Sequence, residues 1–144
     1  MIEQDSVRLL RECDAGVKMG VDSIDEVLDR VEGRDFYKIL SESRREHEEL
    51  EREIEELLSR YHDDGKEPNP MAKAMSHVKS EMKIMMDKND KTIACLMTDG
   101  CNMGVKSLNK YLNEYKAADE KSKDIAKRLI NLEEKLAVDI RDYL

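Results

Sequence analysis

The side chains of this sequence that could hold a metal ion are three histidines, three cysteines and many carboxylates. A di-iron centre in a helical bundle needs a glutamate from each of two helices and a Glu-x-x-His pair from each of the other two, all facing inward. The histidines are His47, His62 and His77, and the residues three positions before them are Arg44, Ser59 and Ala74. Since the sequence holds no Glu-x-x-His pair, we expect no such di-iron centre.

Five residues remain as candidates for a metal site near the middle of the predicted helices. They are His47, Cys101, Asp99, Glu46 and Glu12. The three carboxylates lie beside the inward faces of their helices, where acidic side chains are ordinarily solvated. We therefore expect no cofactor, with iron or another transition metal as the alternative.

Cys101 and His47 could also act as a nucleophile and its base. Such a pair needs an oxyanion hole and a third group that orients the histidine, and no motif in the sequence supplies either. The spacing Gly16-x-x-x-Gly20 is not a phosphate-binding loop, because no strand precedes it and both glycines lie inside a predicted helix. The sequence thus predicts no catalytic residue.

The cysteines indicate the compartment. Cys13, Cys95 and Cys101 have neither metal-knuckle nor redox spacing. Their odd number, without a signal-peptide pattern at the start of the chain, predicts a reducing, cytoplasmic environment. No apolar run approaches the roughly 20 residues that a membrane span needs, so we expect no membrane association.

The composition is typical of a single helical domain that comprises residues 1–144. Charged residues make up 40% of the chain and aromatic residues 4%, and only two prolines and six glycines interrupt the pattern. The net charge of -8 argues against nucleic acid, which requires a basic surface. A protein partner or a second copy of the chain is the expected kind of partner.

One stretch occurs twice, at an offset of 84 positions. Residues 16–31 read GVKMGVDSIDEVLDRV, and residues 100–115 read GCNMGVKSLNKYLNEY. Gly16 and Gly20 correspond to Gly100 and Gly104, and we expect these four glycines to allow helices to approach closely or to make room for a bulky neighbour. A glycine inside a helix costs about 1 kcal/mol relative to alanine, which implies a packing reason. Two copies are too few for a solenoid and predict two halves of one domain.

Apolar residues at alternating spacings of three and four predict two helical hairpins. Their helices cover residues 7–31 with 35–61, and 92–116 with 119–143, and a crossover helix covers 71–86 after the glycine- and proline-rich break at 62–70. Ser6 is the predicted N-cap of the first helix, and Gly33 is its predicted end. The inward residues of the second helix are predicted to be Leu40, Ser43, His47, Leu50, Ile54, Leu57 and Tyr61. Those of the last helix are Ile125, Leu129, Leu132, Leu136 and Ile140, all aliphatic.

The segments GKEPNPMAKAMSHVKSEMK and DGCNMGVKSLNKY resemble ferritin-like four-helix bundles of bacterial families of unknown function. The resemblance covers most of residues 7–143 and implies two hairpins joined by a long crossover. Gly104 and Tyr111 keep the glycine-tyrosine spacing of those families. The carboxylates that such families place around the glycine would fall near Gly100, Asn102 and Val105, none of which is acidic. The repeat implies a pseudo-twofold axis near Gly20 and Gly104, where the first and third main helices should cross antiparallel.

His47 is predicted to face inward, in space provided by Gly20 and Gly104. A buried imidazole needs a hydrogen-bond partner, and Ser43 on the preceding turn is the nearest candidate. We expect a neutral ring whose pKa lies below about 6.5, with a ligand to a metal or small molecule as the alternative. The sequence thus favours a non-catalytic bundle that acts through its surface or by self-association. A metal-binding or redox protein with a degenerate site around His47 and Cys101 is the second hypothesis.

Overall fold

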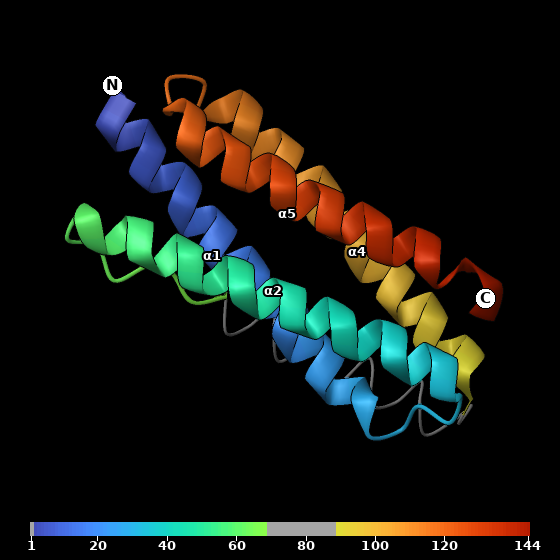
Figure 1. Cartoon of the computed structure of the whole chain (residues 1–144). Coiled ribbons are helices and arrows are strands. Elements are labelled where there is room, and N and C mark those ends of the chain that lie inside the picture. The colour runs from blue at the N-terminus through green and yellow to red at the C-terminus, as the bar shows by residue number, and fades with distance from the viewer. Residues whose placement is uncertain (1, 69–88) are drawn as a thin grey trace.

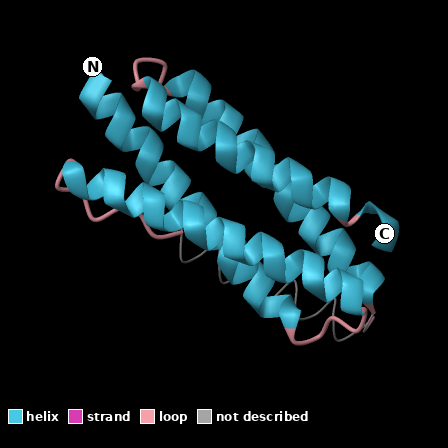
Figure 2. Cartoon of the chain, viewed as in Figure 1, coloured by secondary structure: helices cyan, strands magenta, loops and turns pink. Residues whose placement is uncertain are grey.

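The computed structural model describes residues 2–68 and 89–144 (Figure 1). Its helices are α1 (Ile2–Leu28), α2 (Arg34–Arg60), α4 (Asp90–Glu114) and α5 (Glu120–Asp139), followed by the short 3-10 helix η1 (Arg141–Tyr143). The described residues contain no strand (Figure 2). The prediction of an all-helical fold is therefore confirmed for these residues.

The axes of α1, α2, α4 and α5 are roughly aligned, and these helices form a bundle (Figure 1). α1 packs mainly against α2 and α4 mainly against α5, and within each pair the two helices run in opposite directions (Figure 1). The two hairpins meet through contacts of α1 with α4 and α5, and of α2 with α5. The N-terminus lies beside the connection between α4 and α5, and the C-terminus lies at the other end of the bundle (Figure 1).

The bounds of α1 differ most from their prediction. α1 starts before Ser6, so Ser6 is not its N-cap. The Ser6 side chain is buried instead, and its hydroxyl accepts a hydrogen bond of 2.8 Å from the backbone N–H of Asp119. Gly33 does not end α1, which stops at Leu28, but is the N-cap of α2 in an extended conformation.

The other helices begin within two residues of their predicted starts. Asn89 caps α4 by accepting from the backbone N–H of Thr92 at 2.9 Å, and Asp119 caps α5 by accepting from that of Ser122 at 2.7 Å. α5 ends at Asp139 and is followed by η1, so the predicted end of the last helix at residue 143 is too late. The predicted crossover helix at 71–86 lies outside the described residues.

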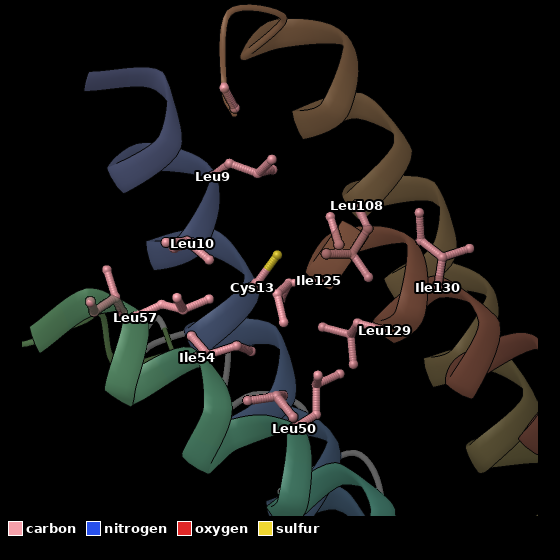
Figure 3. Packing of buried hydrophobic residues seen from close by; sticks show 14 residues of the cluster. Leu9, Leu10, Cys13, Leu50, Ile54, Leu57, Leu108, Ile125, Leu129 and Ile130 are labelled. Atoms are coloured by element: carbon pink, nitrogen blue, oxygen red, sulfur yellow. The ribbon is translucent and has the colours of Figure 1, made fainter. Parts of the chain in front are cut away.

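The buried apolar side chains form two separate clusters. The larger, which we call the Leu9 cluster, contains Leu9, Leu10, Cys13, Val17, Leu50, Ile54, Leu57, Leu58, Leu108, Ala118, Ile125, Ala126, Leu129 and Ile130 (Figure 3). The second, the Phe36 cluster, contains Ile24, Val27, Phe36, Leu40, Ile93, Ala94, Met97, Cys101, Leu136 and Ile140. Helices α1, α2, α4 and α5 each contribute residues to both clusters. Apolar packing therefore holds the bundle together on each side of its middle.

Aspartates tie the hairpins together at both ends of the bundle. At one end, the Asp90 carboxylate accepts hydrogen bonds from the backbone N–H groups of Glu32 at 2.9 Å and Gly33 at 2.8 Å. A Cβ atom on Gly33 would lie 2.9 Å from Asp90 Oδ2, so a side chain would obstruct this approach. At the other end, Asp5 accepts from the backbone N–H of Ala117 at 3.1 Å, and Tyr61 donates to Asp119 at 3.0 Å. Both connections within the hairpins are thereby anchored on the opposite hairpin.

Candidate functional site

The two apolar clusters are separated by a layer of small and polar residues, which we call the central polar layer. Its members are Gly20 of α1, Ser43 and His47 of α2, Gly104 of α4 and Glu133 of α5. His47 is 1% exposed and Glu133 8% exposed, so both titratable side chains are withdrawn from water. This layer is the strongest candidate for a functional site because buried ionisable groups are rare unless they are paired.

His47 and Glu133 form a hydrogen-bonded pair across the two hairpins. The Nε2 atom of His47 lies 2.6 Å from Glu133 Oε1, and its Nδ1 atom lies 2.7 Å from the carbonyl oxygen of Ser43. Ser43 is the predicted partner, and its hydroxyl oxygen is more distant than its carbonyl, at 3.4 Å from Nδ1. The sequence thus indicated Ser43 as a partner of His47, and it missed the contact with Glu133.

The geometry requires two protons on these atoms. The Ser43 carbonyl can only accept, so Nδ1 carries a proton and donates it. A second proton between Nε2 and Oε1 makes the pair an imidazolium beside a carboxylate. Such a pair is neutral overall, and its burial is less costly than burial of a single charge.

The prediction that His47 has a lowered pKa is wrong. Burial acts to lower the pKa of His47, but the hydrogen bond and charge of Glu133, the Ser43 carbonyl and the charge of Glu46 outweigh it, and the pKa is raised above 6.5. The error arose because Glu133 was not expected in the core. The effect of pH on stability therefore has the opposite sign from that of a neutral buried histidine.

The two glycines of the layer make room for this pair. A Cβ atom on Gly20 would lie 2.8 Å from Cδ2 and 2.9 Å from Nε2 of His47, which is closer than side-chain atoms pack. A Cβ atom on Gly104 would lie 3.5 Å from Glu133 Oε2, an ordinary contact. Both glycines thus border one carboxylate, and they lie at the same level of the bundle.

Cys101 borders the layer from α4. Burial, the charge of Glu133 and a hydrogen bond to that carboxylate raise the pKa of the Cys101 thiol well above its usual range. A protonated thiol is a poor nucleophile and a poor metal ligand. Cys101 therefore contributes a weak donor to Glu133 in this structure and shows no activation for chemistry.

The remaining predicted metal candidates are not members of the central polar layer, although the charge of Glu46 acts on His47. Asp99 is exposed, Glu46 pairs with Lys135 at 3.2 Å, and Glu12 pairs with Lys66 at 2.6 Å. Within the described ranges, no three histidine, cysteine, aspartate or glutamate side chains are grouped so that they could hold a metal ion.

Gly16 and Gly100, the other two predicted structural glycines, are less closely packed than Gly20. A Cβ atom on Gly16 would make an ordinary contact of 3.7 Å with Leu129. A Cβ atom on the exposed Gly100 would meet no atom within 4 Å in the part of the chain that the structure describes. Of the four glycines, only Gly20 lies where a side chain would collide with a neighbour.

A second buried acidic residue, Asp14 of α1, was not predicted. Its Oδ2 atom accepts from the Lys18 ammonium at 2.9 Å and from the backbone N–H of Lys66 at 3.0 Å. The close approach of the chain at Gly65, which has a positive φ of 87°, allows this contact. Asp14 thereby fastens the segment after α2 to α1, which is a structural role.

An open groove lies between α2 and α5 on the surface of the described helices. It is lined by Glu46, Glu49, Leu50, Arg128, Asn131, Leu132 and Lys135. Ion pairs between Lys135 and Glu46 and between Arg128 and Glu53 span the same interface. The groove is thus crossed by charged side chains and has no enclosed apolar floor for a small ligand.

The comparisons with known proteins supply no identity. No family model, no curated protein and no solved structure matches this chain. No helix within residues 2–68 and 89–144 combines the length and apolar character that crossing a membrane requires.

We predict opposite effects of alanine at the two glycines of the layer. Gly20→Ala should destabilise the protein by about 1–3 kcal/mol, because the methyl group collides with an imidazole that is held at both nitrogens. Gly104→Ala, the matched control, should leave stability unchanged or raise it by up to about 1 kcal/mol through helix propensity. Urea unfolding followed by circular dichroism measures both changes. Equal effects of the two substitutions would contradict the geometry.

We also predict that stability falls as the solution becomes more alkaline. With a raised folded pKa, the share of stability from His47 is fully present below about pH 6.5 and is lost as pH rises through the folded pKa. One proton corresponds to a slope of at most about 1.4 kcal/mol per pH unit. His47→Gln should remove this slope, whereas His62→Asn, a change at an exposed histidine with positive φ, should retain it. Urea unfolding between about pH 6 and 9 tests the difference.

Proposed function

We propose that this protein is a ferritin-like four-helix bundle that acts without catalysis, through its surface. The bundle would consist of two related hairpins joined by a long crossover, as the sequence resemblance implies. The end contacts support the relation between the hairpins. Asp90 binds the backbone of Gly33 and Asp5 binds that of Ala117, and these two backbone positions are separated by the same 84 residues as the sequence repeat.

The observation that carries this proposal is the hydrogen bonding in the central polar layer. Ferritin-like enzymes place their metal ligands in the bundle core, facing one another. Here the corresponding region holds a pair in which each imidazole nitrogen already has an oxygen partner. A metal ion would have to break the contact between His47 and Glu133 and displace its proton. The layer therefore favours a core that is complete as a folded structure.

The distribution of charge indicates the kind of partner. α1 carries seven acidic and three basic residues, and α2 carries nine and six. α4 carries three of each kind, and α5 five of each kind. The excess negative charge is thus concentrated on the α1–α2 hairpin, which would repel its own copy and attract a basic protein surface. The three cysteines, which are all free, suit the cytoplasm as the place of action.

A metal-binding role is the alternative, and one observation favours it. His47, Glu133 and Cys101 come from three different helices and are connected through the Glu133 carboxylate. The carbonyl that holds the Nδ1 atom of His47 is also the kind of partner that orients a metal-ligating histidine. Replacement of the shared proton by a cation would convert the pair into two ligands.

We predict that protein purified in air binds Fe(II) substoichiometrically and shows no ferroxidase activity. The reason is the absence of Glu-x-x-His pairs from the sequence. Metal analysis and oxygen consumption measure the two quantities. Addition of Co(II) tests the alternative, because a Co(II)–thiolate bond has a charge-transfer absorbance that Cys101→Ser would remove. Two tightly bound metal ions per chain would overturn the proposal.

For the surface role, we predict that binding to basic proteins depends on α2. Replacement of the exposed Glu49 and Glu56 by glutamine should weaken the capture of basic proteins from a cytosolic extract and reduce its dependence on salt. The matched control replaces Glu120 and Glu134, which are exposed on α5, by glutamine and changes the net charge equally. Equal losses in both variants would mean that only net charge matters. A stable dimer in sedimentation experiments would instead favour self-association.

A further inference from the structure

The central polar layer lies at the interface between the α1–α2 and α4–α5 hairpins. The hairpins also pack against each other through the two apolar clusters, one on each side of the layer. His47 belongs to the α1–α2 hairpin and Glu133 to the α4–α5 hairpin, so their hydrogen bond is a bond between hairpins. The Leu9 cluster packs on one side of this bond and the Phe36 cluster on the other. A change in the bond therefore acts on the middle of the interface, between the two apolar clusters, and touches the Phe36 cluster through Cys101.

The bond depends on one proton whichever way the imidazole is protonated. If the neutral ring carries its proton on Nδ1, the Nε2 lone pair faces the carboxylate oxygen at 2.6 Å. If the proton is on Nε2, the Nδ1 lone pair faces the Ser43 carbonyl oxygen at 2.7 Å. Each tautomer of the deprotonated pair thus places two acceptors at hydrogen-bonding distance, which is repulsive. Only the pair with the additional proton satisfies both contacts.

We infer that the His47–Glu133 pair is a proton-held latch between the two hairpins, which opens the middle of the bundle when alkaline solution removes the shared proton. Loss of that proton leaves one uncompensated negative charge on Glu133 in a layer whose titratable side chains are buried. Water must then enter the layer to solvate this charge. Gly20 and Gly104 contribute no side chains of their own beside the carboxylate.

The groups around the pair permit this response. From α2, Glu46 adds a negative charge near His47, although Lys135 of α5 binds it at 3.2 Å. From α4, Cys101 offers a thiol to Glu133, and from α1 the pair meets Gly20. The contacts to the pair thus include no cationic side chain that could replace the imidazolium within the described residues.

Two buried cysteines provide a test with an internal control. Cys101 is 2% exposed and borders the layer, whereas Cys13 is 0% exposed and lies within the Leu9 cluster (Figure 3). Burial and the charges of Glu12 and Asp14 raise the pKa of Cys13 to about 12, so neither thiol reacts until the structure opens. The exposed Cys95 is replaced by serine so that it does not contribute.

The experiment measures the reaction of each thiol in Cys95→Ser protein with a disulfide reagent between about pH 6.5 and 9. Each rate is divided by the rate of the urea-unfolded chain at the same pH, which removes the titration of the free thiol. Protection of Cys101 should fall by up to about tenfold per pH unit between about pH 6.5 and the folded pKa of His47, while Cys13 remains protected. Glu133→Gln should abolish this fall, because the amide can donate to Nε2 without an additional proton.

Three results would overturn the inference. Protection of Cys101 could be independent of pH, Cys13 and Cys101 could lose protection together, or the fall could persist unchanged in Glu133→Gln. If Glu133→Gln does not fold, His47→Gln serves in its place, since its amide can donate to the carboxylate at every pH. Because the experiment involves neither a metal nor a partner, its failure is distinguishable from failure of the proposed function.

Discussion

A buried imidazole and a buried carboxylate can share the middle of a small bundle only when one proton lies between them. This requirement explains several features at once. The ring and the carboxylate must approach within hydrogen-bonding distance from opposite hairpins, so the helices that flank them must leave room. Leucine and isoleucine side chains cannot occupy the same level, and the apolar core is therefore divided in two. The pair thus accounts for the glycines at this level of α1 and α4 and for the division of the apolar core.

The pair is better understood as a constraint on the fold than as a source of stability. Removal of two ionisable groups from water costs about as much as their attraction returns, and apolar residues of similar volume often serve equally well. Breaking such a pair on one side is different, because it strands a charge in the core. A sequence that contains this layer is thus committed to one partner for each group. The same reasoning explains why Gly20 is tolerated inside α1 despite its unfavourable helix propensity.

The helices could be predicted from spacing because their apolar residues recur with the period of the turn. Leu40, His47, Leu50 and Ile54 are buried as the pattern of α2 indicated. Glu133 could not be predicted in this way, because a lysine- and glutamate-rich stretch reads as a solvated face and Leu132 competes for the inward position. In the structure Leu132 is half-buried and Glu133 faces inward. The signal that could have indicated this was His47 itself, an inward imidazole with no assigned partner on a neighbouring helix.

The spacing of apolar residues also could not predict the polar contacts at the ends of the bundle. Ser6 has the residue type of an N-cap, but its hydroxyl serves the other hairpin, a contact between positions more than a hundred residues apart. Gly33 resembles a helix stop, yet its main constraint is the carboxylate of Asp90. Local rules describe each helix well and fail where two hairpins share a hydrogen bond. Such contacts depend on the tertiary arrangement, which no single segment encodes.

The division of the core has a consequence for how the chain finds its fold. Each hairpin can form from contacts that are close in sequence, and docking of the hairpins is the step that must choose an alignment. Two apolar faces alone would tolerate a slip of one helical turn, because leucine and isoleucine can replace one another in most positions. A slip of one turn, however, would bury His47 against one aliphatic surface and Glu133 against another. The central layer therefore favours one alignment of the hairpins, because misaligned hairpins would contain two unpaired buried groups.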